Sequence, residues 1–172
     1  YIYGPKDDPY HRTPNWRKPY PAREGEELKV LVNRAKENNV IFYWAIHPGQ
    51  DIRWNEEDRS LLLQKFESMY QLGVRGFAVF FDDISGEGTK ADKQAELLNY
   101  IDDHFVKVKR DVAPLILCPT EYNKSWTDVE GGYLTTLGDK LNEGIKVMWT
   151  GDMVVATIAV SYTHLRAHET RR

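Results

Sequence analysis

Residues 76–88 read GFAVFFDDISGEG, and the fold is best approached from this stretch. Its first six residues are mostly large and apolar, as in a strand that is buried on both faces. The strand ends in two adjacent carboxylates, Asp82 and Asp83, and a glycine-rich loop follows. Two carboxylates side by side at the end of a buried strand repel each other, so their presence there requires a physical explanation.

The sequence on either side alternates between helical and extended patterns. Residues 24–38 place apolar side chains at helical spacing, and Asn55 is suited to cap a second helix that Gly73 ends. Further helices are predicted at residues 90–108 and 134–141, and further strands at residues 1–3, 40–46, 115–118 and 146–150. No hairpin signals join the strands, so we predict βα units and a parallel sheet.

Two α/β architectures have such a sheet. A doubly wound sheet is expected to carry a glycine-rich phosphate loop after its first strand, but the segment there, GPKDDPYHR, has no G-x-G-x-x-G motif. Polar and aromatic residues follow every strand instead, in GPKDD, HPGQD, FDDIS, PTEYN and WTGD. Barrel enzymes collect their active sites at this edge. We therefore predict an α/β fold, a partial (β/α)8 TIM barrel with about five of the eight strands present.

The composition excludes several classes of protein. Of the 172 residues, 41% are hydrophobic and 28% are charged, as in a globular protein. No apolar run approaches the roughly 20 residues of a membrane helix. The formal net charge is −3, without the basic stripe that nucleic-acid binding uses. The single cysteine, Cys118, excludes an internal disulfide.

The Asp82–Asp83 pair has two interpretations. Successive strand residues point to opposite faces, but at a strand end the backbone turns and both side chains can reach the rim. Two carboxylates a few ångströms apart do not ionise independently, and a protonated carboxyl beside an ionised one is a suitable general acid. The alternative is a loop-start pair in which Asp83 caps the SGEG turn.

Residues after the other strands extend the candidate site. Lys6 can donate to sugar hydroxyls or phosphates, and Tyr122 supplies a phenolic donor, although either can be an ordinary surface or packed residue. A metallohydrolase could use His47, His11 and Asp51, but no HxH or HExxH spacing supports such a metal site. Three tryptophans could stack on a sugar or belong to the core: Trp54, Trp126 and Trp149.

Four motifs together resemble glycoside hydrolase family 84: YIYGPKDDPYHR, FAVFFDDI, CPTEYNKSW and VMWTGD. They occur in order over residues 1 to about 155. Among the family, the sequence resembles bacterial members of the O-GlcNAcase type. The resemblance implies retaining, substrate-assisted hydrolysis of terminal β-linked N-acetylglucosamine on a (β/α)8 barrel, with no metal or organic cofactor. The nucleophile is then the carbonyl oxygen of the sugar's own 2-acetamido group.

This mechanism explains how both carboxylates can belong to one strand end. The resemblance implies that Asp82 holds the acetamido N–H and stabilises the oxazolinium-like intermediate. It implies that Asp83 protonates the leaving oxygen and then activates water. It places Lys6 on a sugar hydroxyl and Tyr122 on the acetamido group. The wall of the acetamide pocket is expected to contain three further residues: Cys118, Thr150 and Val154.

The chain departs from the family pattern at both ends. The family's first strand precedes Tyr1, and the segment that carries a sugar-binding Asn and Asp is replaced by VSYTHLRAHET at residues 160–170. That segment resembles a translated sequencing adapter, with a genuine basic tail as the alternative. We therefore expect a partial glycoside hydrolase barrel at residues 1–155, inactive alone, and a non-native tail at residues 156–172.

Partners and location follow from the resemblance. Glycans or glycoproteins that contain N-acetylglucosamine are the expected partners, with no nucleic acid and no membrane span. Secretion or a periplasmic location is implied if the protein is bacterial. The alternatives from other classes are a metal-dependent barrel hydrolase that uses Asp82, Asp83 and His47, and a non-catalytic sugar-binding fragment.

Overall fold

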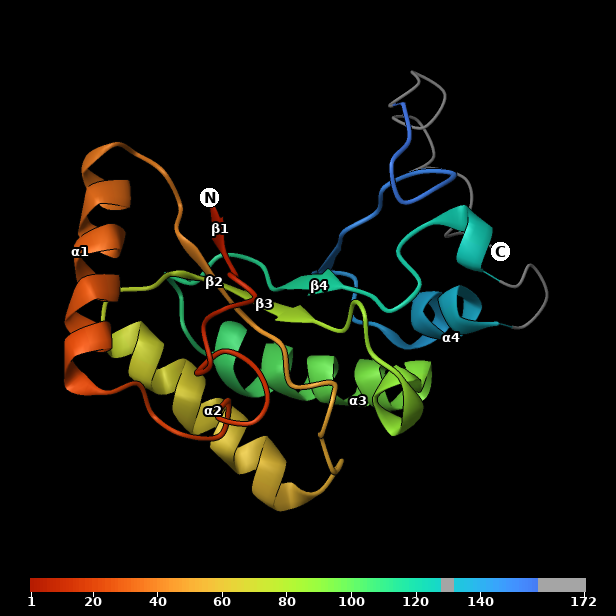
Figure 1. The fold of residues 1–172 in the computed structure, drawn as a ribbon, viewed down its shortest axis with the longest axis horizontal. Coiled ribbons are helices and arrows are strands. Elements are labelled where there is room, and N and C mark those ends of the chain that lie inside the picture. The colour runs from red at the N-terminus through yellow and green to blue at the C-terminus, as the bar shows by residue number, and fades with distance from the viewer. Residues whose placement is uncertain (128–131, 158–172) are drawn as a thin grey trace.

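The computed structural model of the chain describes residues 1–127 and 132–157, and most of the expected tail lies outside them. The strands are β1 (Ile2–Tyr3), β2 (Tyr43–Ile46), β3 (Gly76–Phe80), β4 (Ile116–Cys118) and β5 (Lys146–Val147). The α-helices are α1 (Ala22–Glu37), α2 (Glu56–Gln71), α3 (Ala91–Ile101) and α4 (Tyr133–Lys140). Helices and strands alternate along the chain, as the sequence predicts (Figure 1).

The five strands form one parallel sheet in the order β1-β2-β3-β4-β5. Each strand therefore pairs with the next strand in the sequence, and the order never reverses. A doubly wound sheet changes direction at a switch point, whereas a barrel adds its strands in sequence. The predicted α/β fold and partial barrel are confirmed.

One face of the sheet is covered by helices. Alternate strand residues, including Trp44, Phe77 and Leu117, join a single buried cluster with side chains of α1, α2, α3 and α4. On the other face of the sheet, the larger residues Phe80 and Cys118 are only partly buried. They face away from the helices, toward the inside of the barrel arc. Figure 1 shows α2 and α3 packed along the same side of the strands.

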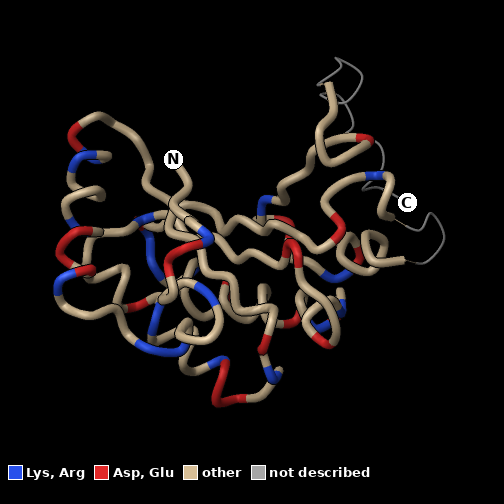
Figure 2. Tube along the Cα trace, in the orientation of Figure 1, with Lys and Arg blue, Asp and Glu red and all other residues tan. Residues whose placement is uncertain are grey.

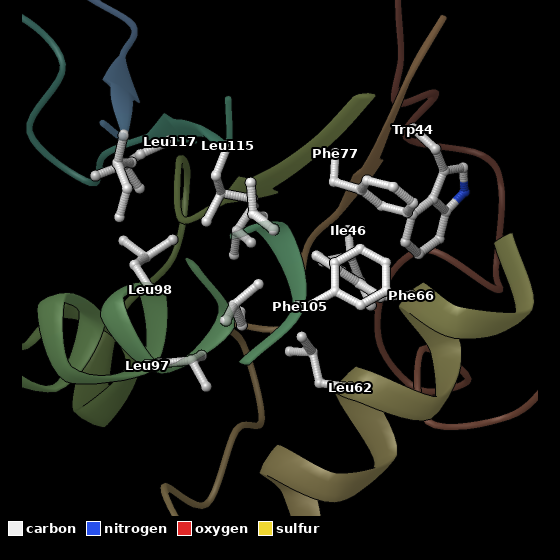
Figure 3. Packing of buried hydrophobic residues seen from close by; sticks show 14 of the residues in the cluster. Trp44, Ile46, Leu62, Phe66, Phe77, Leu97, Leu98, Phe105, Leu115 and Leu117 are labelled. Atoms are coloured by element: carbon white, nitrogen blue, oxygen red, sulfur yellow. The ribbon is translucent and has the colours of Figure 1, made fainter. Parts of the chain in front are cut away.

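Aromatic rings hold the centre of this core together (Figure 3). Phe66 of α2 stacks on Phe77 of β3 at 4.9 Å between ring centroids. Phe105 meets the edges of both, 5.4 Å from Phe66 and 4.9 Å from Phe77. Trp44 meets Phe66 at 5.9 Å. Such pairs contribute about 0.5–1.5 kcal/mol each beyond the burial of their area, so this cluster fixes the distance between the sheet and its helices.

The predicted start and end of α2 are confirmed, whereas the predicted extent of the helix at residues 90–108 is wrong. The Asn55 side chain accepts the backbone N–H of Asp58 at 2.9 Å, and Gly73 ends the turn at φ 103°. The helix expected at residues 90–108 instead passes into a π-helix, Asp102–Val106. The buried Asp102 carboxylate accepts Asn142 Nδ2 at 2.8 Å, and this contact with the segment after α4 accompanies the wider turn.

A long connection, residues 4–21, joins β1 to α1 and is anchored by Arg17. The guanidinium makes two parallel hydrogen bonds of 2.7 Å to the buried carboxylate of Asp58, and a third to Asp51. Arg53 adds its backbone N–H and its guanidinium to Asp58. This network ties the loop after β1 to the start of α2, and thereby holds the edge of the sheet where the candidate site lies.

The surface charges are mixed. Basic and acidic residues are interspersed along the helices and loops (Figure 2). Within residues 1–127 and 132–157, no helix is long and apolar enough to cross a membrane.

We predict that Asp58→Asn destabilises the chain by about 3–5 kcal/mol at pH 7, because it removes the buried carboxylate to which both Arg17 and Arg53 donate. Burial alone raises the pKa of Asp58, but the hydrogen bonds from Arg17 and Arg53 outweigh it and hold the pKa below its usual range. The folded carboxylate is thus favoured above the unfolded pKa of about 3.9, and its contribution declines as pH falls further. Urea unfolding should show a smaller difference between variant and wild type at pH 3 than at pH 7.

The matched control is Glu56→Gln, which removes an exposed carboxylate from the first turn of the same helix. Its effect should stay within about 1 kcal/mol at both pH values. A loss for Asp58→Asn no larger than this control would contradict the anchoring role.

Candidate active site

The two adjacent carboxylates share one edge of the sheet because the backbone leaves the extended conformation at Asp83 and turns. Asp82 lies two residues after the end of β3, and Asp83 adopts φ 53°, in the left-handed region. This conformation is uncommon for residues other than glycine, and Asp is one of those that tolerate it. Lys6 contacts both side chains: its Nζ lies 3.6 Å from Asp82 Oδ2 and forms a short ion pair with Asp83 Oδ2.

Lys6 reaches the pair from the far side of β2. The loop after β1 can approach because Gly4 has no side chain: a Cβ at that position would lie 3.0 Å from the Phe80 ring and 3.1 Å from Ala45 Cβ. The hydrogen bond to Asp83 raises the pKa of Lys6 and outweighs the opposing effect of burial, and the charges of Asp82 and Asp83 act in the same direction as the hydrogen bond. Lys6 therefore stays an ammonium beside the two carboxylates.

The two carboxylates have different environments. The Asp82 side chain is 16% exposed and that of Asp83 is 54% exposed. Burial acts to raise the pKa of Asp82, but the proximity of His47 and Lys6 outweighs it and lowers the pKa. Asp82 Oδ1 is buried and has no hydrogen-bond partner within the described part of the chain. The inner carboxylate is thus an anion whose Oδ1 lies 3.5 Å from His47 Nε2 without a hydrogen bond, while the outer one faces solvent.

Cys118 and Tyr122 complete the neighbourhood of the pair. Cys118 lies opposite Phe80 in the β3–β4 register. Burial raises the pKa of its thiol to about 12, and the charges of Asp82 and Asp83 act in the same direction. The Tyr122 pKa is also raised, by burial and then by the charges of Asp83 and Asp82. Both groups remain neutral, so they can line a site or donate a hydrogen bond without adding charge.

Thr150 and Val154 belong to the loop after β5. The Thr150 backbone N–H donates to the Tyr122 carbonyl at 3.0 Å, and its Oγ1 donates to the Met153 carbonyl at 2.8 Å. Thr150 therefore joins the loops after β4 and β5. Val154 is 44% exposed in the same segment. The assignment of both residues to a pocket wall stays a prediction.

A buried polar network beneath the rim was missed by sequence reasoning. Gln94 of α3 is fully buried, and its amide donates to the Gly88 carbonyl at 2.7 Å and to Thr120 Oγ1 at 2.9 Å. Thr120 Oγ1 donates to the Phe81 carbonyl at 2.9 Å, and the Tyr133 hydroxyl donates to the Gln94 side chain. The network joins the loops after β3 and β4 next to Asp82. One glutamine in the sequence of an amphipathic helix does not indicate that its side chain links two loops.

The residues proposed for a metal site converge only in part: His11 and His47 line one small cavity, whereas Asp51 lies in the Arg17 network. Asp51 Oδ1 accepts Thr13 Oγ1 at 2.9 Å and Trp16 Nε1 at 2.7 Å, in the Arg17 network. His47 contacts Asp82 instead. Among residues 1–127 and 132–157, no group of three or more His, Cys, Asp or Glu side chains is arranged to hold a metal ion.

The three tryptophans differ in exposure and contacts. Trp54 donates its Nε1–H to the Glu87 carbonyl at 3.1 Å and lies 6.1 Å from the Phe81 ring, so it supports the loop after β3. Trp126 is 46% exposed and meets Tyr122 edge to face at 4.8 Å. Trp149 is 40% exposed. Trp126 contacts the predicted site residue Tyr122 and can present a ring to a ligand.

The comparisons with known proteins agree with one another. A family model described as beta-N-acetylglucosaminidase matches residues 1–172. The Protein O-GlcNAcase of Rattus norvegicus is 37% identical over 165 residues, which are 91% of this chain and 18% of the relative. The Protein O-GlcNAcase of Mus musculus gives the same identity and coverage. The chain therefore spans less than a fifth of the length of these curated relatives.

Two solved structures are similar over nearly the whole chain. The structure of CpGH84B has a TM-score of 0.84 and 44% sequence identity, over 91% of this chain and 28% of the other. A mutant of the Thermobaculum terrenum O-GlcNAc hydrolase has a TM-score of 0.79 and 32% identity, over 90% of this chain and 35% of the other.

We predict that Cys118 resists alkylation in the folded chain. With a thiol pKa of about 12, the reactive thiolate at pH 8 is about 10³-fold scarcer than for an ordinary cysteine of pKa about 8.5. Iodoacetamide labelling at pH 8, followed by mass spectrometry, reports this site alone because the chain has one cysteine. The urea-unfolded chain is the control. Folded and unfolded rates within about tenfold of each other would contradict the buried, anion-flanked position of the thiol.

Proposed function

The chain belongs to the β-N-acetylglucosaminidase family, glycoside hydrolase family 84, and from this membership we propose the activity of the protein that carries it. That protein hydrolyses terminal β-linked N-acetylglucosamine with retention of configuration and with the substrate's own acetamido group as nucleophile. The observation that carries the proposal is the unequal environment of two adjacent carboxylates, Asp82 and Asp83.

Asp82 acts on the acetamido group. It is the inner carboxylate, its pKa is lowered, and its Oδ1 is a buried acceptor without a partner among the described residues. An amide N–H satisfies such an acceptor. The hydrogen bond increases the nucleophilicity of the acetamido oxygen, and the negative charge stabilises the cationic oxazolinium-like intermediate. Since the charge develops only as the oxygen attacks, this interaction strengthens toward the transition state.

Asp83 transfers protons. Its side chain is 54% exposed, so it can reach a leaving-group oxygen first and a water molecule afterwards. In the first step its proton passes to the oxygen of the departing alcohol while the acetamido oxygen bonds to the anomeric carbon. In the second step Asp83 removes a proton from water, which attacks the same carbon and reopens the oxazoline ring. Configuration is retained because the carbon is inverted twice.

Neighbouring side chains orient the sugar. The Lys6 ammonium is 60% exposed beside the pair, so it can exchange its contact with Asp83 for a sugar hydroxyl. The Tyr122 hydroxyl stays protonated and is a donor to the acetamido carbonyl. The Cys118 thiol stays neutral, so it lines the pocket without placing a further charge beside Asp82. Glycans or glycoproteins that end in N-acetylglucosamine are the proposed substrates, in line with the names of the O-GlcNAcase relatives.

We expect Asp83→Asn to separate substrates by leaving group. In the full-length protein, kcat/KM for an alkyl N-acetylglucosaminide should fall about 10²–10⁴-fold, because a poor leaving group needs the proton. For a dinitrophenyl N-acetylglucosaminide, which departs with little protonation, the loss should be much smaller. Asp7→Asn, which changes an exposed carboxylate of the loop after β1, is the control and should leave both rates unchanged. Equal losses for the two substrates would remove Asp83 from the acid role.

A further inference from the structure

His47 occupies a fixed position beside the inner carboxylate. It follows β2 directly, and β2 pairs with the strand that delivers Asp82. Its side chain is 6% exposed. The backbone N–H of His47 donates to the His11 carbonyl at 2.7 Å, so the loop after β1 holds the residue from its other side. The imidazole is thus enclosed between two loops of the candidate site.

The imidazole contacts the backbone and the side chain of one residue. His47 Nε2 lies 2.7 Å from the Asp82 carbonyl oxygen and 3.5 Å from Asp82 Oδ1. A carbonyl oxygen only accepts, so Nε2 carries a proton in both charge states of the ring. This N–H therefore fixes the backbone at Asp82, one residue before the left-handed turn at Asp83.

Two glycines allow the loop of His47 to lie close to the loop after β3. A Cβ at Gly88 would lie 1.9 Å from the Gly49 carbonyl oxygen. A Cβ at Gly49 would lie 2.6 Å from Ile84 Cδ1 and 2.8 Å from Phe81 Cδ1. The Gly88 contact is with backbone, so the loops after β2 and β3 approach backbone to backbone at Gly49 and Gly88, while the Gly49 contacts are with side chains of the second loop. The distance between His47 and Asp82 is set by this packing.

A small cavity of about 50 Å³ lies at the same point and is lined by Lys6, His11, Arg12, His47 and Asp82, together with Gly4 and Phe80. Asp82 Oδ1 and His47 Nδ1 are both buried and lack hydrogen-bond partners within the described residues. The imidazole donates to the backbone carbonyl of Asp82 and lies 3.5 Å from Oδ1, beyond a good hydrogen bond. Oδ1 is therefore a buried acceptor at this cavity that still lacks a hydrogen bond.

We propose that His47 is a positioning residue for Asp82: its Nε2–H clamps the backbone carbonyl of Asp82 and orients the carboxylate so that Oδ1 stays free to accept the acetamido N–H. This inference rests on the function proposed above, because the acetamido group is the ligand that Oδ1 receives. The signal in the sequence is the HPG segment after the second strand, which could be assigned to a metal site as readily as to this role.

The catalytic test compares two substitutions in the full-length protein. His47→Leu removes the donor, whereas His47→Gln keeps an N–H at a similar reach. We expect His47→Leu to lower kcat about 10–100-fold, a loss of the size found when a residue that orients a metal ligand is removed. KM should change much less, and His47→Gln should recover most of the rate. Met69→Ala, a buried change on α2, is the control for lost stability and should leave kcat unchanged. A kcat for His47→Leu no lower than that of Met69→Ala, or no recovery in His47→Gln, would overturn the proposal.

A second measurement does not depend on activity. Carboxyl ¹³C NMR of the 172-residue chain follows the titration of Asp82, whose pKa is lowered by His47 and Lys6. His47→Leu should move the midpoint to higher pH, and His47→Gln, which restores the N–H, should move it less. An unchanged midpoint in His47→Leu would overturn the inference. If the midpoint moves but the wild-type protein hydrolyses no N-acetylglucosaminide, the proposed function fails and the contact of His47 with Asp82 stands.

Discussion

The left-handed backbone of Asp83 is the constraint on which the candidate site depends. In a continued strand, Asp82 and Asp83 would point to opposite faces of the sheet, one of them into the helices. At φ 53° the chain turns, and both carboxylates come within reach of one ammonium, Lys6. A sparsely populated conformation costs about 1–3 kcal/mol and persists only where the surroundings enforce it. Here the enforcing contacts are His47 on the Asp82 carbonyl and Thr120 on the Phe81 carbonyl.

The fold explains why these contacts come from distant parts of the sequence. Parallel strands place all their carboxyl ends at one edge, so the loops after β1, β2, β3 and β4 meet there. Each loop supplies a different chemical group: Lys6 an ammonium, His47 an imidazole, Asp82 and Asp83 carboxylates, and Tyr122 a phenol. The helices bury the opposite face of the sheet around Phe66 and Phe77, and this rigid layer keeps the strand ends in register.

Sequence reasoning predicted the repeating elements because each depends on local pattern. The cap at Asn55, the stop at Gly73 and the apolar strand before Asp82 needed no tertiary information, and the parallel barrel arc followed from their alternation. The carboxylate pair was found because two adjacent charges after a buried strand are unusual.

The roles of His47 and Gln94, and the π-helix at Asp102–Val106, could not be predicted. Each depends on partners far away in the chain: Asp82 for His47, Gly88 and Thr120 for Gln94, and Asn142 for Asp102. The strands at both ends of the sheet are shorter than expected. β1 and β5 have two residues each, since each has a single neighbouring strand within the described sheet.

The central claim is that a substrate amide oxygen, held by Asp82, is the nucleophile. It is tested most directly by the rates of acetyl, fluoroacetyl, difluoroacetyl and trifluoroacetyl glucosaminides, measured with the full-length protein and with Asp82→Asn. Fluorine withdraws electrons from the amide oxygen, so kcat should fall steadily along the series. Asp82→Asn should lower the rate for the acetyl substrate and flatten the slope. Fluorine reduces the nucleophilicity of the amide oxygen, and Asp82 increases it, so the effect of fluorine is smaller once Asp82 is lost. A wild-type series without slope would mean a protein nucleophile and would contradict the account.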